Sequence, residues 1–172
     1  VYSVSGEYGL GETYAGVYAP ELIEPIVRFL KGYLIGHPIG NDLVFDQIKN
    51  IPFIGGKGIL QSVFSALEIA IWDLRGKLLD KPVCELITNN PRKTLPVYAS
   101  SGTVIFSPNE IKNDVENILS LGHSAYKMRV GFQNWDIDLK RVESAKNTLE
   151  NSDIMIDAIM GTLRPAWSLD KA

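Results

Sequence analysis

Apolar residues recur at helical spacing over three stretches in the first half of the chain. The clearest is residues 60–79, where they form one broad stripe. Helical spacing also runs from Pro20 to about Leu34, and Asn41 offers an N-cap for a helix that ends near Ile48. We therefore predict three helices here. The stripe of the longest one consists of Leu60, Val63, Phe64, Leu67, Ala70, Ile71, Leu74 and Leu78.

The segments beside these helices have the composition of turns and short strands. Residues 1–17 hold four glycines between short apolar stretches, which predicts two short strands joined by tight turns. Residues 50–58 hold a proline and three glycines, which predicts a loop. A linker is expected at residues 91–94.

From Leu95 onward the pattern changes to short apolar strands that alternate with helices. Such alternation at short period predicts a parallel sheet built from βαβ units, so the fold class is α/β. We expect a first domain at residues 1–94 and a second at residues 95–172. In the second domain, strands are predicted at 96–100, 125–130 and 153–158, and helices at 108–121, at 136–149 and from Ser168 onward.

Charge and cysteine content exclude several classes of protein. The net charge of −3 provides no basic field for nucleic acid or anionic lipid, so neither partner is expected. One cysteine, Cys84, excludes a disulfide framework and a cysteine-based zinc site, which favours a reducing, cytoplasmic location. No apolar run reaches the ~18 residues of a membrane span. The chain starts at Val1 in a strand-like segment and stops at Ala172 in an expected helix, so we interpret it as a fragment.

Charged residues near the ends of two predicted strands are the best candidates for chemistry. A strand covered by helices should be almost wholly apolar, yet Lys127 and Arg129 share one face of the strand at 125–130. Asp157 directly follows the apolar residues of the next strand. Because ligands bind at the carboxyl ends of parallel strands, these three side chains are expected to converge on one pocket. The alternative is an ion-paired edge strand without catalytic function.

Two other features of the sequence are weaker candidate sites. Residues 55–58 have glycines around a lysine as a phosphate loop does, but Gly58 replaces the hydroxyl residue that should follow the lysine, so a simple loop is expected. Ser100 and Ser101 end the first strand of the second domain and are weaker candidates for lining the pocket.

The order and spacing of several motifs resemble the enolase superfamily, in its mandelate racemase and muconate lactonizing enzyme branch. The resemblance runs through nearly the whole chain. In the first half, Gly9–Thr13 is similar to the hairpin of that family's capping domain, and Ala66–Lys77 with Lys81–Val83 is similar to its long helix. In the second half, Leu95–Ser101 is similar to the first barrel strand, and Lys127–Arg129 matches the family's Lys-x-Lys/Arg motif. Met155–Ala158 is similar to the strand that carries the first magnesium ligand.

The resemblance implies an α+β capping domain followed by the first three units of a (β/α)₈ barrel. It also implies an enzyme that removes the proton α to a carboxylate, with Mg²⁺ stabilising the enediolate. Asp157 would be a metal ligand, and Lys127 and Arg129 would be catalytic. The loops at 6–8 and 54–58 would close over a small carboxylate substrate, and the full-length protein is expected to form homo-oligomers.

Departures from the family pattern leave the reaction open. Arg129 stands where racemases and cycloisomerases of the branch typically have lysine, so we expect an acid-sugar dehydratase that acts in carbohydrate acid catabolism. A racemase or cycloisomerase of the same branch is the alternative, as is a truncated non-catalytic protein. The remaining acidic metal ligands and a His–Asp pair would follow residue 172, so the 172-residue chain alone is expected to be inactive.

Overall fold

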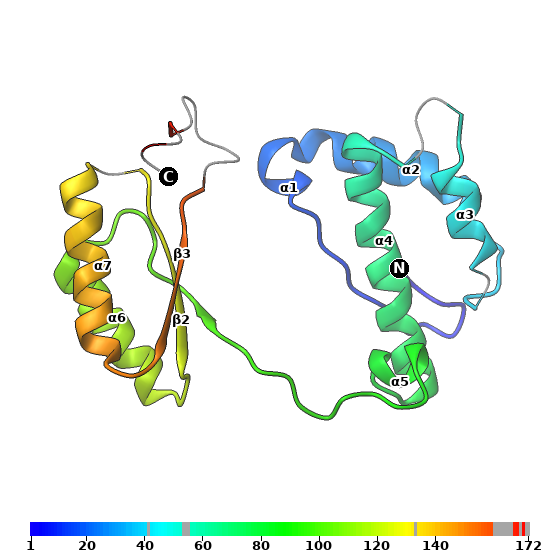
Figure 1. The fold of residues 1–172 in the computed structure, drawn as a ribbon. Helices are drawn as coiled ribbons and strands as arrows, with labels where there is room; N and C mark the ends of the chain where they lie inside the picture. The colour runs from blue at the N-terminus through cyan, green and yellow to red at the C-terminus, as the bar shows by residue number, and fades with distance from the viewer. Residues whose placement is uncertain (41, 53–55, 133, 160–166, 169, 171–172) are drawn as a thin grey trace. The chain divides into compact units, whose positions relative to one another are not determined.

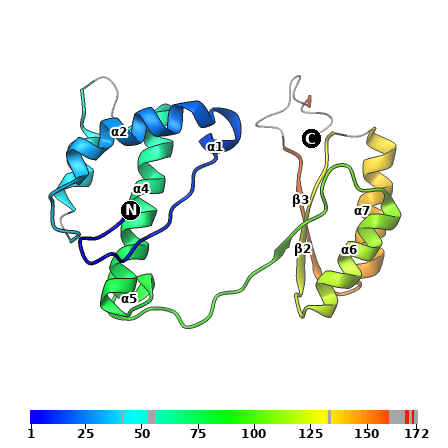
Figure 2. The same cartoon turned by 180° about the vertical axis from the view of Figure 1, so that it is seen from behind.

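The computed structural model describes residues 1–40, 42–52, 56–132, 134–159, 167, 168 and 170. It divides into two compact units, Val1–Lys93 and Thr94–Ala172 (Figures 1 and 2). This division lies one residue before the boundary predicted from the sequence. The assignment of the units as a capping domain and a barrel domain stays a prediction.

The first unit is built from helices. The predicted helices are present as α2, α3 and α4, with a 3-10 turn before α2, whereas α1 and α5 were not predicted. Asn41, the expected N-cap of α3, lies outside the described residues, and the N-cap position is held by Asp42 without a side-chain capping bond. The bounds are α1 Ala15–Tyr18, η1 Pro20–Leu22, α2 Ile23–Leu34, α3 Leu43–Lys49, α4 Gly58–Leu79 and α5 Val83–Ile87.

The core of the first unit lies where α2 and α3 pack on the apolar stripe of α4. Phe45 and Phe64 meet edge to face, with ring centroids 5.8 Å apart. Arg75 is buried beside them and pairs with Asp42 at 2.7 Å. Among the described residues, no helix is long and apolar enough to span a membrane. The buried apolar members of this core are Leu30, Val44, Phe45, Ile48, Phe64 and Ile71.

The prediction of two strands at the beginning of the chain is wrong. Residues 1–18 contain one isolated antiparallel bridge, Tyr2–Tyr8, and the short helix α1. The segment instead runs along α4 (Figure 1), where the Leu10 amide donates to Asp73 at 2.8 Å and Lys77 donates to the Tyr8 carbonyl at 3.0 Å. Before α1, backbone bonds within the segment are confined to the turn around the bridge, such as Ser3 to Glu7 and Gly9 to Val1, while Tyr8 and Leu10 bond to side chains of α4.

Two glycines permit this close approach. A Cβ at Gly9 would lie 1.9 Å from the Ala70 carbonyl oxygen, and one at Gly11 would lie 1.8 Å from the Ala66 carbonyl oxygen. Real Cβ atoms are never that near to backbone, so any side chain here would push the segment off the helix.

The second unit is α/β, as predicted, with a three-stranded parallel sheet in the order β1-β2-β3. Helices α6 and α7 cover one face of the sheet (Figures 1 and 2). The bounds are β1 Ala99–Ser100, α6 Pro108–Ser120, β2 Ala125–Arg129, α7 Trp135–Leu149 and β3 Asp153–Asp157.

Side-chain caps and strand pairing explain these bounds. Ser107 and Glu110 form a reciprocal capping box at the start of α6, and the Asn134 side chain accepts from the Asp136 amide at the start of α7. The first strand is shorter than predicted because β2 begins at Ala125, so residues 96–97 have no neighbour on that side. Ser168 is not helical, and most of the helix expected after it lies outside the described residues.

We expect Gly9→Ala to reduce the free energy of unfolding by about 1–3 kcal/mol or more, because the new methyl group overlaps the backbone of α4. Gly16→Ala in α1 is the matched control: its Cβ would meet no atom within 4 Å, so stability should change by less than about 0.5 kcal/mol or rise slightly. Urea unfolding followed by circular dichroism measures both changes. Equal stability of the two variants would contradict the close packing of the N-terminal segment.

Candidate active site

The two faces of β2 have different surroundings. Tyr126 and Met128 are fully buried against α6 and α7. Because side chains alternate along a strand, Lys127 and Arg129 lie on the opposite face, on which no helix lies among the described residues of this unit; we call it the helix-free face. The parallel register places Arg129 beside Asp157, so Asp157 shares that helix-free face.

The structure brings Lys127 and Asp157 into direct contact. The Lys127 Nζ lies 2.8 Å from Asp157 Oδ2, across adjacent strands, with side-chain exposures of 21% and 38%. The other carboxylate oxygen, Oδ1, accepts from the Ile159 amide at 2.9 Å. Arg129 is exposed and close enough to act on the same carboxylate electrostatically. The three predicted site residues therefore form one charged cluster at the carboxyl ends of β2 and β3.

Hydrogen bonding controls the ionisation of Asp157. The bond from Lys127 and then the bond from the Ile159 amide lower the pKa of Asp157 below its ordinary value, and the charges of Lys127 and Arg129 act in the same direction. The carboxylate is consequently ionised at neutral pH. Ile159 itself has φ of +56°, a conformation that costs a β-branched residue energy.

The two serines at the end of the first strand, Ser100 in β1 and Ser101 directly after it, point in different directions. Ser100 pairs with Lys127 in the register and so shares the helix-free face. The Ser101 hydroxyl instead donates to Asp114 of α6 at 3.0 Å. Ser101 is therefore turned away from the charged cluster, and its interpretation as a pocket residue was wrong.

Sequence reasoning missed a layer of polar residues behind the strand ends. Asp114 accepts hydrogen bonds from Ser101, from the Gly102 amide at 3.0 Å and from the Tyr126 hydroxyl at 2.6 Å. Burial, together with the Asp114 carboxylate, raises the pKa of Tyr126, which stays protonated and donates. On α7, Asp138 and Arg141 form a buried pair at 2.6 Å. The sequence does carry a signal for two of these residues. Asp114 and Arg141 lie at helical spacing from the apolar residues of their helices, which places them on the buried face.

Known proteins resemble the chain along most or all of its length. Muconate cycloisomerase 1-1 of Acinetobacter lwoffii is 30% identical over 181 residues, which cover 100% of this chain and 45% of that protein. D-galactonate dehydratase of Cronobacter sakazakii is 29% identical over 131 residues, 74% of this chain and 33% of that protein. The solved 3,6-anhydro-D-galactonate cycloisomerase of Zobellia galactanivorans is 26% identical with a TM-score of 0.78, over 94% of this chain and 45% of that chain.

The chain belongs to the enolase superfamily, in its mandelate racemase and muconate lactonizing enzyme branch. It spans less than half the length of these three proteins. The three-stranded sheet thus corresponds to an incomplete barrel of that superfamily. No family model matches the sequence.

Magnesium is the metal that membership of this superfamily implies. Asp157 suits it, because its carboxylate is ionised, partly exposed and a hard oxygen donor. Among the described residues, no group of three or more histidine, cysteine or acidic side chains is arranged to hold a metal ion. This part of the superfamily fold therefore supplies one fitting ligand and two neighbouring cations.

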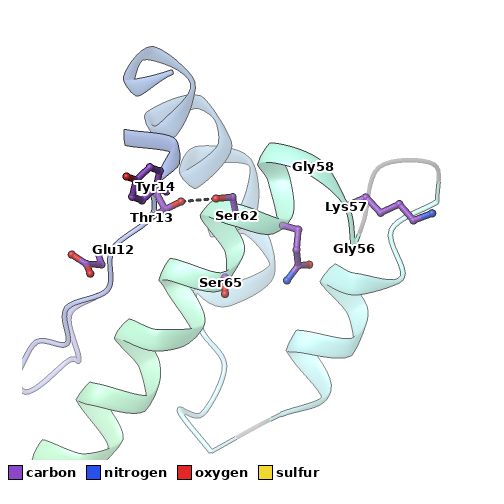
Figure 3. Close-up of a pocket in the computed structure, with 9 residues that line it drawn as sticks. Glu12, Thr13, Tyr14, Gly56, Lys57, Gly58, Ser62 and Ser65 are labelled. Atoms are coloured by element: carbon purple, nitrogen blue, oxygen red, sulfur yellow. Dashed lines mark hydrogen bonds between the residues drawn. The ribbon is translucent and has the colours of Figure 1, made fainter. Parts of the chain in front are cut away.

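A second candidate region is a groove of about 560 Å³ in the first unit. Figure 3 shows that its lining comes from the N-terminal segment, from the residues before α4 and from the first turns of α4. A hydrogen bond of 2.6 Å joins Thr13 to Ser62 across these elements. The lining is rich in hydroxyl, amide and charged groups: Glu12, Thr13, Tyr14, Gly56, Lys57, Gly58, Gln61, Ser62 and Ser65.

The two loops expected to close over substrate lie in different surroundings. Gly56–Gly58 line this groove, while Ile54 and Gly55 lie outside the described residues. Residues 6–8 lie at the Tyr2–Tyr8 bridge instead, where the Tyr8 ring stacks on Lys77 at 4.7 Å. Their closing role in this superfamily member stays a prediction.

We expect the pKa of Asp157 to lie below the ordinary value of about 3.9 and to rise in Lys127→Met, which loses the largest cause of the shift. Because the folded-state pKa is lowered, the Lys127–Asp157 pair stabilises the fold above the ordinary pKa and loses this effect as the pH falls through the lowered value. Carbon-13 NMR titration of the carboxyl groups measures the shift.

Asp73 is the internal control for this titration. Its pKa is lowered by Lys77 in the first unit and should not change in Lys127→Met. An unchanged Asp157 pKa in the variant would contradict the pairing.

Proposed function

We propose that the complete protein is a Mg²⁺-dependent lyase that removes the proton α to the carboxylate of a sugar acid and then eliminates water. The observation that carries the proposal is the cluster of Lys127, Arg129 and Asp157 on the helix-free face at the strand ends. Similarity to a D-galactonate dehydratase supports a sugar acid as the substrate class.

The charges in the cluster suit the chemistry of this proton transfer. A proton α to a carboxylate is very weakly acidic, because its removal concentrates negative charge on the carboxylate oxygens. Cations already in place stabilise that charge without reorganisation, and Lys127 and Arg129 provide two of them. Bound Mg²⁺, with Asp157 as one ligand, would add further stabilisation of the same charge.

Arg129 directs the proposal toward elimination. Its guanidinium stays protonated at every working pH, so it cannot accept the α-proton. Racemisation needs a proton acceptor on each face of the α-carbon, whereas elimination needs one base, which can then protonate the departing hydroxyl. A histidine from the part of the protein beyond this chain would suit that role, since its pKa lies near neutrality. Lys127 and Arg129 then hold the substrate carboxylate.

A cycloisomerase acting on a sugar acid is the second candidate. The two cycloisomerases match 94% and 100% of this chain, whereas the dehydratase matches 74%. The same cations and carboxylate serve both reactions, because both begin by removing the α-proton. Mass spectrometry of the product separates them: dehydration gives a product lighter by one water, and cycloisomerisation gives one of unchanged mass.

In the complete protein with Mg²⁺, we expect the α-proton of a six-carbon sugar acid, D-galactonate first, to exchange with D₂O. Lys127→Met and Asp157→Asn should each lower the exchange rate by about 100-fold or more, since each removes a charge that the transition state needs. Proton NMR of the substrate measures the exchange.

Lys112→Met is the matched control, because Lys112 forms an exposed ion pair with Glu116 on α6, away from the cluster. Exchange that survives Asp157→Asn at the wild-type rate would overturn the assignment. If Lys127→Met alone abolishes exchange while loss of a downstream histidine leaves it intact, Lys127 is the base. Inversion of the α-carbon without loss of water would indicate a racemase.

Magnesium titrated into the 172-residue chain should give no saturable heat of binding in isothermal calorimetry. One carboxylate holds Mg²⁺ weakly, because the ion gives up its water reluctantly. Tight binding that Asp157→Asn abolishes would show that the described residues form a complete site.

A further inference from the structure

A buried ion pair on α7 lies directly behind the carboxyl ends of β1 and β2. Arg141 is fully buried and Asp138 almost so, and the two side chains meet at 2.6 Å. Both lie on the helix-covered side of the sheet, so neither side chain joins the charged cluster of Lys127, Arg129 and Asp157. Their polar atoms instead contact the backbone of the strand ends.

Arg141 holds carbonyl groups from two separate segments. One terminal nitrogen of its guanidinium donates to the Arg129 carbonyl at 3.1 Å, and the other donates to the Thr103 carbonyl at 2.7 Å and the Gly102 carbonyl at 3.4 Å. Asp138 accepts from the Gly131 amide at 2.8 Å. The pair thus bonds to backbone on both sides of Val130 and to the loop after β1.

The backbone at Arg129 is held from three directions. The Arg129 amide donates to the Gly102 carbonyl at 3.0 Å, and the Val130 amide donates to the Asp157 carbonyl at 2.9 Å. Gly102 packs directly against β2, because a Cβ there would lie 2.5 Å from the Met128 Cβ. Arg141 completes this arrangement, so the point from which the Arg129 side chain leaves the backbone depends on it.

Stability alone is a weak reason for such a pair. Removing both charges from water is costly, and well-packed apolar residues of similar volume often stabilise a fold equally well. The Arg141 Nε is buried without a hydrogen-bond partner in the described part of the chain, so even this pair is incompletely satisfied. An apolar side chain would fill the space but could not orient three carbonyl groups. Directional bonding is what the arginine fork adds.

We propose that Arg141, oriented by Asp138, is a positioning residue that holds the strand ends so that the Arg129 side chain meets the substrate carboxylate. This inference rests on the proposed function, in which Arg129 contacts that carboxylate. Arg141 acts through the backbone and does not itself reach the helix-free face.

A double-mutant cycle in the complete protein tests the proposal. We expect Arg141→Met to lower kcat/KM for D-galactonate by about 10- to 100-fold, chiefly through a higher KM, because a small displacement of a binding group is costly. In the Arg129→Met background, adding Arg141→Met should lower kcat/KM by less than about threefold further, because its effect passes through Arg129. If the double variant loses kcat/KM by the product of the two single losses, the proposal is overturned.

Arg75→Met is the matched control, because Arg75 is also a buried arginine paired with an aspartate, but it lies in the first unit. If the two variants acted only by reducing stability, the loss of kcat/KM from each would multiply with the loss from Arg129→Met. If Arg141 positions Arg129, the Arg75→Met loss should multiply and the Arg141→Met loss should not. If Arg141→Met does not fold, Arg141→Lys takes its place: it keeps a charge beside Asp138 but lacks the fork that reaches three carbonyls.

Amide hydrogen exchange tests the same proposal without activity. The Arg129 and Gly131 amides should exchange at least about tenfold faster in Arg141→Met or Arg141→Lys than in the wild type, while amides in the middle of α4 keep their rates. Unchanged exchange at Arg129 and Gly131 would overturn the positioning role. A wild-type protein that acts on no sugar acid, yet shows this faster exchange in the variants, would refute the proposed function and leave the positioning of the strand ends intact.

Discussion

The candidate site depends on the fact that helices α6 and α7 occupy the same face of the parallel sheet. Tyr126, Met128 and Val130 supply the apolar surface that binds these helices. Because side chains alternate along a strand, Lys127 and Arg129 lie on the other face, and the register with β3 places Asp157 there too. Charged residues in the middle of a buried strand would be costly if both faces were covered. Here Lys127 and Asp157 remain partly exposed and pair with each other, and Arg129 is exposed.

Local patterns explain why much of this arrangement was predictable. The alternation of charged and apolar residues in 125–130 reports directly which side chains share a face, so the convergence of Lys127 with Asp157 followed from the sequence. The long helix α4 was equally clear, because its apolar stripe is continuous. The helix and the face shared by Lys127 and Arg129 arise from neighbours in the chain, and the approach of Asp157 needs only the general rule that carboxyl ends of adjacent parallel strands meet at one edge of the sheet.

Features that depend on distant contacts were not predictable in the same way. Arg141 bonds to Gly102, 39 residues earlier, and nothing in the spacing of either residue specifies that partner. Residues 1–17 resembled a hairpin, but Gly9 and Gly11 serve to approach α4. Ser101 looked like a pocket residue because it follows a strand, yet Asp114 turns it toward the helices. In each case tertiary contact decided between two locally reasonable conformations.

The crowding around Gly102 has a consequence for how this fold can diverge. Gly102 has φ of +56° and touches Met128 and Tyr126 so closely that no other residue fits, and its amide is bonded to Asp114. The helix-covered side of the strand ends is therefore intolerant of substitution. Ser100 and Met155 share the opposite face with Lys127, where a new side chain points away from α6 and α7. Selection can thus alter the side chains around the charged cluster on one face of the sheet while stability is maintained by the other.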